Sequence, residues 1–354
     1  MFRPFVALLL TLALAACSDD GDKPGIEAGT PDGPVVDRGP GSDIAVPDAS
    51  PDQAVADTLS PDTSSTSPSG WTELMTAPNQ LNAVWAKDAN TAYIVGQGGT
   101  ILSYNGTAWA SMQNTEKDDL YGVWGNASKV WAAGTGGKMA WDGSAWAKIT
   151  TSTYSFVDLK AGATNLYAPT STTYIYYKSQ TSTSTYWSSI YLYSVLAGKT
   201  IQALWVLSDS HAVAVGTDGL ILQCTATCTT ASNWKAMTSG TTTHLNAIWG
   251  SSATDVFAVG LDGTVLHYDG TAWSKMTINT ATYFYGVWGT GPTDVWAVGH
   301  PIFKADESIF HYDGSSWTKT PPPKTSFLNA VHGSGTKDVW AVGKSNILHF
   351  TGKP

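Results

Sequence analysis

Arginine is missing from most of this chain. From residue 71 to the end the sequence contains 16 lysines and no arginine. A sialidase-like enzyme clamps the carboxylate of its substrate with several guanidinium groups, which pair bidentately, so the absence of arginine excludes that chemistry. The same part of the chain holds 17 acidic residues and is nearly neutral. Because capture of a phosphate backbone depends on an excess of positive charge, we expect no nucleic-acid partner.

The chain also lacks an apolar run long enough to span a bilayer. Residues 5–16 are mostly apolar, but a spanning helix needs about 20 such residues. Arg3 precedes the run and Leu-Ala-Ala-Cys at 14–17 ends it, which is typical of a bacterial lipoprotein signal. We therefore predict that residues 1–17 are a signal peptide with its lipobox. Cys17 is then the lipidated residue, and the lipid anchor is the only attachment to the membrane.

Aromatic residues are absent between residues 18 and 68. Residues 18–70 carry 11 acidic and 2 basic residues, so most of the net negative charge of the chain lies here. Such a segment cannot bury enough apolar surface to offset its ordering entropy, and we predict a disordered tether over residues 18–68. Ser18 stands where enteric lipoproteins retained in the inner membrane have aspartate. By that resemblance we expect an outer-membrane lipoprotein, either periplasmic or surface-exposed.

What the sequence does contain is one pattern written about seven times. The fullest copy is LNAIWGSSATDVFAVGLDGTVLHYDGTAWSKMT, residues 245–277. Its first motif is apolar-x-small-apolar-Trp, and the equivalent fifth positions are residues 85, 124, 160, 205, 249, 288 and 332. Each copy contains four short segments rich in Val, Trp and Tyr that are typical of strands. Four strands in about forty residues predict an all-β, seven-bladed β-propeller of four-stranded antiparallel blades.

The two ends of the repeat array complete each other. The seventh copy stops at ILHFTGKP and lacks its Trp strand, whereas residues 69–76, SGWTELMT, match that strand. We predict that this N-terminal strand completes the last blade and closes the ring, which removes exposed sheet edges. The propeller is therefore expected to span residues 69–354. The third copy, around residues 156–160, is the most degenerate, and whether it forms a full blade stays open.

The repeated polar residues are expected to be structural. Asn-Gly and Asp-Gly pairs such as 105–106 and 262–263 supply positive φ angles for tight hairpins. We expect the aspartates before the second strand to cap local backbone, and the histidines of the third strand to pack. These residues are Asp255, Asp294, Asp338, His267, His311 and His349. All 16 tryptophans lie from residue 71 onward. We expect most of them to fill the wedges between blades, although rings that stacked on sugars would favour a lectin.

Two cysteines remain besides Cys17. Cys224 and Cys228 lie where other copies turn from the third to the fourth strand. In an exported protein this spacing predicts a local disulfide, since no helix follows to favour a redox-active pair. The other histidines have no Cys or Glu at metal-ligand spacing, so we expect no metal and no cofactor.

The loops that differ between copies are better candidates for function than the residues that repeat. In a four-stranded blade, the connections from each fourth strand to the next first strand share a face with the turns between second and third strands; we call this face the rim. It is a typical place for binding, because variable loops stand on a rigid scaffold. The candidate binding residues on it are Tyr121, Tyr154, Tyr283, Tyr285, His300, Phe303, Lys304 and Asp306.

The combination VWG, DVWAVG and LHYDG followed by Trp resembles the propeller repeats of secreted bacterial lipoproteins, broadly of the Kelch, WD40 and YVTN-like superfamily. It is more loosely similar to tectonin-type lectin repeats. The resemblance covers residues 71–354 and implies the fold, but the group has no common catalytic residues to transfer.

These observations predict a non-enzymatic, lipid-anchored propeller that acts as an extracytoplasmic binding module for a protein or a cell-envelope glycan, and we expect a monomer. Two alternatives stay open. One is an enzyme acting on envelope carbohydrate, which would need a pair of carboxylates from Asp118, Asp119, Asp306 and Glu307. The other is a periplasmic scaffold for outer-membrane assembly.

Overall fold

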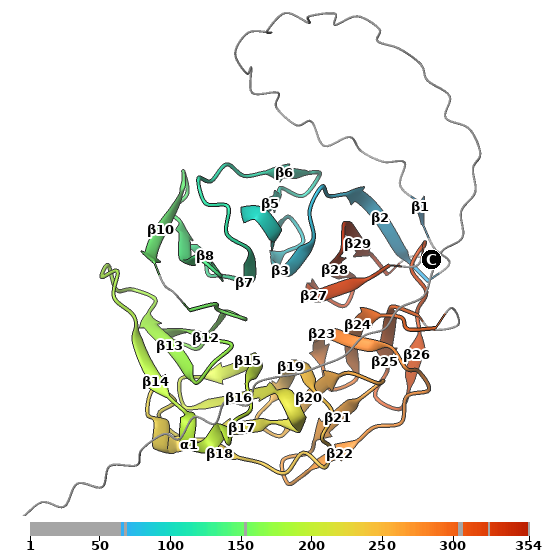
Figure 1. Ribbon diagram of the computed structural model, residues 1–354. Helices are drawn as coiled ribbons and strands as arrows, with labels where there is room; N and C mark the ends of the chain where they lie inside the picture. Colours follow the sequence, from blue (N-terminus) through green and yellow to red (C-terminus); the bar gives the residue numbers. More distant parts are fainter. Residues whose placement is uncertain (1–64, 67–68, 152–153, 304–306, 325, 353–354) are drawn as a thin grey trace, which may run out of the picture. The chain divides into compact units, whose positions relative to one another are not determined.

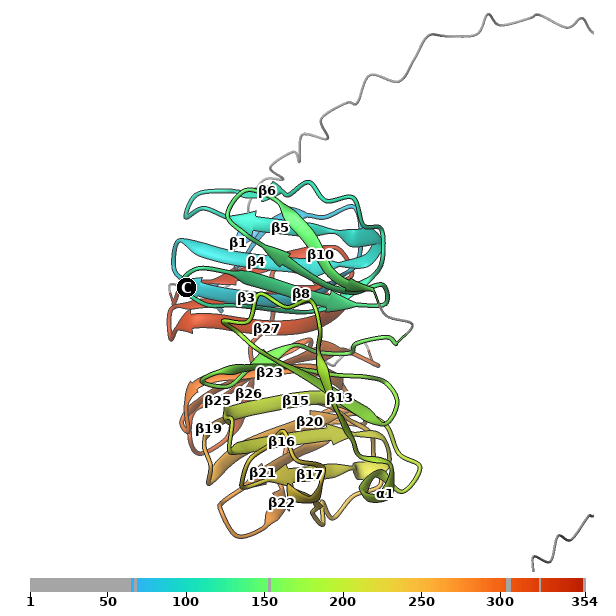
Figure 2. The ribbon, with the colours of Figure 1, turned by 90° about the vertical axis from the view of Figure 1, so that its left-hand side faces the viewer.

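The computed structural model of the chain describes residues 65–66, 69–151, 154–303, 307–324 and 326–352. Within them it forms seven antiparallel sheets arranged as the blades of a closed ring (Figure 1). The strands of each blade run between the two faces of the ring (Figure 2). Among the described residues, no helix is long and apolar enough to cross a membrane. The predicted signal peptide with Cys17, most of the predicted tether, Lys304 and Asp306 lie outside the described residues.

Blades 1 to 4 follow the chain in order. Blade 1 contains β3 (Leu81–Asp88), β4 (Thr91–Gly96), β5 (Ile101–Tyr104) and β6 (Trp109–Ser111). Blade 2 contains β7 (Leu120–Gly125), β8 (Val130–Gly134), β9 (Gly137–Trp141) and β10 (Trp146–Thr151). Blade 3 contains β11 (Lys160–Ala161), β12 (Asn165–Pro169), β13 (Tyr174–Ser179) and β14 (Ser188–Tyr191), followed by the short helix α1 (Tyr193–Leu196). Blade 4 contains β15 (Ile201–Ser208), β16 (His211–Gly216), β17 (Ile221–Cys224) and β18 (Trp234–Ala236).

Blades 5 to 7 complete the ring. Blade 5 contains β19 (Leu245–Ser252), β20 (Asp255–Gly260), β21 (Val265–Tyr268) and β22 (Trp273–Lys275). Blade 6 contains β23 (Tyr283–Gly291), β24 (Asp294–His300), β25 (Ile309–Tyr312) and β26 (Trp317–Lys319). Blade 7 contains β27 (Leu328–Gly335), β28 (Asp338–Gly343), β29 (Asn346–Phe350) and, from the other end of the chain, β2 (Trp71–Thr76). The degenerate third copy therefore does form a blade, with its first strand reduced to two residues.

Ring closure follows the predicted pairing. Strand β2 pairs with β29, and Trp71 lies opposite Phe350. The Trp71 side chain is fully buried, and its ring meets that of Trp296 in blade 6 edge-on, with centroids 5.4 Å apart. A two-residue strand that the sequence does not predict, β1 (Ser65–Thr66), pairs with β2 as a fifth strand of this blade. The structure also joins Cys224 and Cys228 in a disulfide, as the sequence predicts.

The sequence predicted positive φ angles for the Asp-Gly and Asn-Gly pairs of the hairpins. The structure has them at both residues of the pair between second and third strands, but only at the glycine between third and fourth strands. Between second and third strands, Asp262 and Gly263 both have positive φ, 53° and 63°. Between third and fourth strands only the glycine does, as at Gly106 with φ 92°. There the Asn105 side chain accepts hydrogen bonds from the backbone N–H of Thr107 and Ala108, both at 3.0 Å. The reason is loop length: four residues separate the paired Tyr104 and Trp109, and such loops are built around turns that need only one positive φ.

Tryptophan and glycine interlock between neighbouring blades, and this explains the Trp-Gly pairs in the repeat. A Cβ at Gly125 of blade 2 would lie 2.4 Å from the Trp85 ring of blade 1. The Gly250, Gly289 and Gly333 positions meet the ring of the preceding blade in the same way. The residue that follows the fifth residue of the first motif therefore has a small side chain wherever the preceding blade has Trp at its own fifth residue. Blade 7 supplies His332 instead, and blade 1 accordingly carries Ala86, whose N–H donates to His332 Nδ1 at 3.1 Å.

We predict that Gly125→Ala lowers the free energy of unfolding by about 1–3 kcal/mol, because the new methyl group overlaps the Trp85 ring. Denaturant unfolding followed by circular dichroism measures the change. Gly335→Ala is the matched control, since a Cβ there has no atom within 4 Å. Adding Trp85→His to Gly125→Ala recreates the His332–Ala86 combination, so the double variant should be less destabilised than the sum of the single variants. If the destabilisation of the double variant equalled the sum of the two single variants, this account of the interface would be contradicted.

Candidate functional site

The first strands of the blades line a cavity on the axis of the ring. Its volume is about 350 Å³, which falls within the range of small-molecule sites. Each first strand except β11 carries a bulge at the second residue of the first motif, as between Leu81 and Ala83 in β3. A bulge breaks the alternation of faces and re-aims side chains. As a result both the second and the fifth residue of the first motif contribute to the cavity wall.

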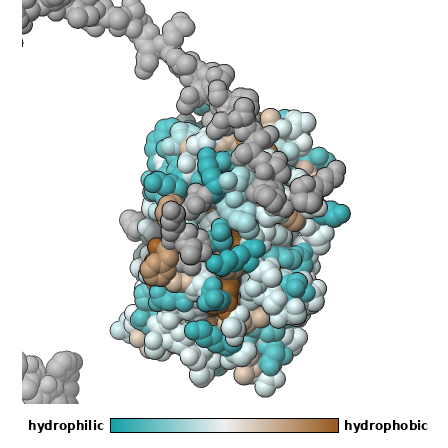
Figure 3. Space-filling view, turned by 90° about the vertical axis from the view of Figure 1, so that its right-hand side faces the viewer, coloured by the Kyte–Doolittle hydropathy of each residue, from teal (hydrophilic) through white to brown (hydrophobic). Residues whose placement is uncertain are grey.

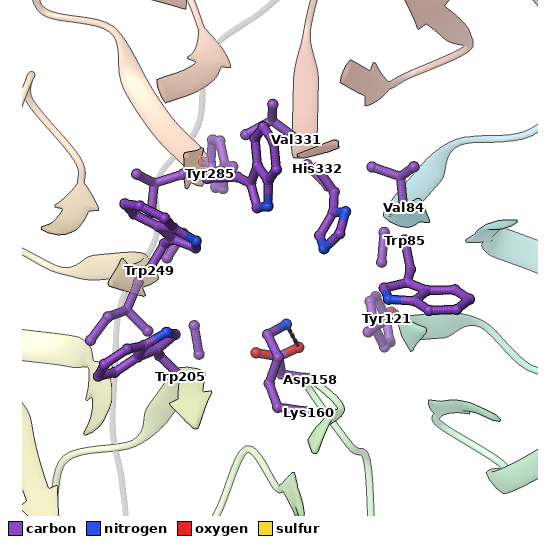
Figure 4. Close-up of a pocket in the computed structure, with 18 of the residues that line it drawn as sticks. Val84, Trp85, Tyr121, Asp158, Lys160, Trp205, Trp249, Tyr285, Val331 and His332 are labelled. Atoms are coloured by element: carbon purple, nitrogen blue, oxygen red, sulfur yellow. Dashed lines mark hydrogen bonds and ion pairs between the residues drawn. The ribbon is translucent and has the colours of Figure 1, made fainter. Parts of the chain in front are cut away.

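The fifth residues form what we call the channel ring. It consists of Trp85, Trp124, Lys160, Trp205, Trp249, Trp288 and His332, one from each blade. Figure 4 shows Lys160 and His332 pointing into the channel, with the indole nitrogens of Trp85, Trp205 and Trp249 on the channel side of their rings. Sequence reasoning assigned the tryptophans to interblade packing and overlooked this ring. The signal that could have revealed it is that the two departures from Trp, Lys160 and His332, fall at the same position of the repeat.

Lys160 is held beside the only carboxylate among the residues that line the cavity. Lys160 Nζ lies 2.6 Å from Asp158 Oδ1. The Asp158 side chain is buried and also accepts hydrogen bonds from the backbone N–H of Leu159, at 2.7 Å, and of Leu204 in blade 4, at 3.1 Å. These three donors satisfy the buried carboxylate, as buried charges require. The pair therefore fixes a cation at the channel while leaving the net charge of the wall near zero.

His332 faces the channel as a neutral imidazole. Burial, and after it the positive charge of Lys160, lower the pKa of His332 to about 3. Its Nδ1 accepts the hydrogen bond from the Ala86 N–H at 3.1 Å, which requires that nitrogen to be unprotonated. The ring proton of the neutral form is therefore on Nε2, so that this nitrogen is a hydrogen-bond donor at neutral pH.

The second residues of the motif line the channel nearer the rim, because each first strand begins at that face. Where this residue is asparagine, its amide clasps the next blade: Asn82 Nδ2 donates to the Leu120 carbonyl at 2.9 Å, and Asn246 Nδ2 to that of Phe284 at 2.8 Å. Asn329 Nδ2 donates to the Leu81 carbonyl at 2.8 Å and so bridges the closing blades. In blades 2 and 6 the position holds Tyr121 and Tyr285, and both phenols line the cavity.

The described residues of the predicted rim belong to blades 2, 3 and 6. Tyr283, Tyr285 and His300 come together in blade 6: Tyr283 pairs with His300, and the Tyr285 and His300 rings lie 4.4 Å apart. His300 also contacts Phe327 edge-on at 5.3 Å, and His300 Nε2 lies 2.9 Å from Asn329 Oδ1. Phe303 lies in the β24–β25 connection, three residues after His300, and its side chain is 64% exposed. We call Tyr283, Tyr285, His300, Phe303 and Phe327 the blade 6 cluster.

Two other predicted rim residues lie elsewhere. Tyr121 of blade 2 lines the channel, and its hydroxyl lies 3.5 Å from Asp119 Oδ2. Tyr154 belongs to a row of tyrosines in blade 3, with its ring 5.7 Å from Tyr174 and 5.8 Å from Tyr176. The row continues to Tyr191 and Tyr193, which stack at 6.0 Å. We call Tyr154, Tyr174, Tyr176, Tyr191 and Tyr193 the blade 3 tyrosine row.

The repeated histidines and aspartates make the same contact in three blades. His267, His311 and His349 each place Nε2 2.6–2.7 Å from the carboxylate of Asp255, Asp294 and Asp338 respectively. A hydroxyl from Ser251, Thr290 or Ser334 donates to the other oxygen of the same carboxylate. The aspartates therefore bind side chains across the blade, and the prediction of local backbone caps was incomplete. The histidines pack as predicted; His349, for example, stacks on Trp340 at 3.7 Å.

This arrangement does not activate a nucleophile. In each set the serine or threonine hydroxyl and the histidine both donate to one aspartate, whereas a nucleophilic hydroxyl must donate to the base itself. Two of the four carboxylates named for the carbohydrate-enzyme alternative already have partners: Asp118 lies 3.4 Å from Lys148 Nζ, and Asp119 accepts the Gly98 N–H at 2.9 Å. Within the described residues no group of three His, Cys, Asp or Glu side chains could hold a metal ion.

A buried lysine lies between blades 2 and 3, away from the channel. Lys138 of β9 occupies a position where other blades have Ile or Val, and only 2% of its surface is exposed. Its ammonium lies 3.6 Å from the centre of the Phe156 ring, 4.6 Å from that of Trp187 and 4.7 Å from that of Tyr176. The ring faces favour the cation, but burial is the larger effect and lowers the pKa of Lys138 to about 7.

The fold places the chain among β-propellers of known structure. It is similar to YCF48 bound to a D1 peptide, with a TM-score of 0.65 and 14% identity over 80% of this chain and 97% of that one. It is also similar to YCF48 from Cyanidioschyzon merolae, with a TM-score of 0.64 and 17% identity over 79% of this chain and 98% of that one. The WD40 repeats of RRP9 match with a TM-score of 0.64 and 10% identity over 81% of this chain and 99% of that one. The predicted resemblance to WD40-type propellers is thus confirmed at the level of the fold, which is all that such identities establish. No protein-family model and no curated protein matches the sequence.

Proposed function

We propose that this chain is a non-enzymatic, lipid-anchored propeller outside the cytoplasm, and that its rim binds a protein segment through the blade 6 cluster. The observation that carries the proposal is the concentration of apolar and aromatic side chains around one shallow groove. Gln80, His300, Phe327, Asn329 and Lys344 line the groove. Large apolar side chains stand exposed in the same region: Phe303, Ile302 and Phe327.

The composition of this region suits a protein partner. Aromatic side chains beside amides and a lysine resemble the apolar centre and polar rim of a protein interface. Figure 3 shows the side of the ring on which blade 6 lies, and this side is mainly polar, with apolar residues in a few separate spots. YCF48, a propeller of similar fold, has been solved bound to a D1 peptide, which supports a peptide segment as the kind of partner. The lipobox and the tether would place such a module at the outer membrane.

We predict that Tyr285→Ala combined with Phe303→Ala abolishes binding of the protein partner without unfolding the ring, because the pair removes two aromatic contacts from one surface. The partner is first identified by crosslinking to the full chain in cells, and its affinity is then measured with both purified proteins. Tyr191→Ala with Tyr193→Ala is the matched control, since it removes two exposed aromatics from blade 3. Retained affinity in the Tyr285/Phe303 variant would contradict this placement.

A glycan is the second candidate, and the blade 3 tyrosine row favours it. Tyr191 and Tyr193 are more than half exposed and stack with interplanar angle 6°, and exposed aromatic faces are suited to sugar rings. A glycan array probed with the full chain separates the two candidates. Saturable glycan binding that is lost in the Tyr191/Tyr193 variant would replace the protein partner as the primary proposal.

Whether the propeller is exposed at the cell surface can be tested without knowing its ligand. Protease treatment of intact cells should remove the propeller if the lipoprotein is surface-exposed. Protection in intact cells, with cleavage only after the outer membrane is permeabilised, would favour the periplasmic scaffold.

A further inference from the structure

The residues of the channel ring share a property other than aromaticity. The indole N–H of Trp85, Trp124, Trp205, Trp249 and Trp288 is a donor only, and so is the ammonium of Lys160. His332 has its acceptor nitrogen occupied by the Ala86 N–H. The fifth position of the motif therefore holds an N–H donor in every blade. Among the described lining residues, the Asp158 carboxylate is the acceptor that lies beside one of these donors, Lys160. The two copies that lack Trp at this position retain the donor.

Among the described residues, the indole N–H groups of the channel ring meet no acceptor, whereas Lys160 Nζ meets Asp158. Trp234 Nε1 donates to the Cys228 carbonyl, and the Nε1 atoms of Trp146 and Trp317 lie against methionine sulfurs. Several other indoles are buried without a partner. The five indoles of the channel ring belong to neither group within the part of the chain that the structure describes. Figure 4 shows the indole nitrogens of Trp85, Trp205 and Trp249 on the channel side of their rings.

The indoles offer edges to a ligand rather than faces. The Trp85, Trp205, Trp249 and Trp288 rings each cover the glycine of the next blade, at Gly125, Gly250, Gly289 and Gly333 respectively. A sugar stacks on an exposed face, so this geometry disfavours a carbohydrate. Aligned N–H edges instead suit an oxygen-rich group that accepts several hydrogen bonds at once.

The charge of the wall selects among such groups. The described cavity wall holds one lysine and one aspartate, and His332 is neutral. Asp158 already accepts from three N–H groups. Because Asp158 already balances the Lys160 ammonium, an anion must compete with Asp158 for it. A monoanion with two acceptor oxygens then leaves less uncompensated charge than a dianion such as sulfate or a phosphate monoester.

We infer that the axial channel is a binding site for a carboxylate, held by Lys160 Nζ and the surrounding indole N–H groups. The carboxylate comes either from a small free acid or from an acidic side chain that a partner inserts from the rim. This site adjoins the blade 6 cluster, since Tyr285 belongs to that cluster and also lines the channel. Asp158 is the counter-ion that holds Lys160 at the channel wall, and it competes with the ligand for the ammonium.

Calorimetric titration of the full chain tests the site with two pairs of probes. Sodium propionate is compared with neutral propionamide, and an acetylated, amidated glutamyl pentapeptide of otherwise glycine residues is compared with its glutaminyl counterpart. We expect saturable binding of a carboxylate probe and none of its amide. Binding of propionate alone identifies a small acid as the source, and binding of the glutamyl peptide identifies an inserted side chain. The absence of saturable binding for both acids would overturn the inference.

Variants keep the test independent of folding. Lys160→Met should weaken carboxylate binding at least tenfold, and Trp249→Phe severalfold, because it removes one N–H donor and keeps an aromatic ring. Asp158→Asn should tighten binding severalfold by freeing Lys160, a change of sign that a misfolded protein cannot produce. Trp141→Phe, outside the channel, should leave the affinity unchanged. Equal affinity in wild type, Lys160→Met and Asp158→Asn would overturn the site while leaving the proposed rim function standing.

Discussion

Replacing Trp71 with alanine should lower the free energy of unfolding by about 3–5 kcal/mol, the usual cost of removing a large buried aromatic side chain. Trp71 is fully buried, with its ring 5.4 Å from Trp296 and 5.5 Å from Phe350. It comes from the N-terminal end of the propeller, so the cavity would open at the point where the two ends of the ring are held together. The loss should also reduce cooperativity, because blades 6 and 7 share this contact.

Denaturant unfolding measures this change, and Trp71→Phe is the matched control. The Trp71 Nε1 atom is buried without a hydrogen-bond partner among the described residues. Phenylalanine therefore keeps much of the packing and loses no hydrogen bond, so we expect it to cost less than about 1.5 kcal/mol. An alanine variant as stable as wild type would show that β2 is not essential to closure.

The second large effect concerns pH. Lys138 has a pKa of about 7 in the folded protein, against about 10.4 in an unfolded chain. Below pH 7 both states carry the proton, and the folded state bears the full cost of the buried charge. Between these two values the unfolded state binds more protons, so stability rises with pH. We expect a gain on the order of 3 kcal/mol between pH 6 and pH 9.5 from this one group.

Unfolding free energies measured across this range for wild type and Lys138→Met test the prediction. The methionine variant cannot ionise, and its stability should change much less between pH 6 and pH 9.5. Lys235→Met, at an exposed position of β18, should follow the wild-type curve. Parallel curves for wild type and Lys138→Met would mean that the Phe156, Trp187 and Tyr176 rings hold the charged form more strongly than burial opposes it.

Much of the architecture could be predicted from the sequence because a propeller blade is a local unit. The Trp strand missing from the seventh copy and present at Trp71 predicted the closure, and the spacing of the repeat predicted the number of blades. The turns were less predictable. Asn105 and Asp262 both precede glycine, yet only Asp262 adopts a positive φ, because the conformation depends on how many residues the paired strands leave in the loop.

The candidate site was harder to predict from the sequence than the fold. The sequence placed Tyr121, Tyr154 and Tyr285 together in the variable linkers. In the structure Tyr121 and Tyr285 lie in the first strands β7 and β23 and line the channel, whereas Tyr154 joins the tyrosine row of blade 3. The contact of Asp158 with the Leu204 N–H crosses from one blade to the next. Residues about forty positions apart become neighbours only when the blades close around an axis.

By itself, the sequence determined the repeat, the neutral and arginine-free ring, the acidic segment before it and the strand that joins its ends, since these depend on composition and on local pattern. Only the tertiary structure decided which edge of each tryptophan faces the channel, which glycine each ring covers, and that Lys160 and His332 stand in one ring with five indoles. The physical reason is that strand propensity and periodicity act along the chain. The direction of a side chain in a closed ring is set by the bulge in its own strand and by the packing of the blade beside it.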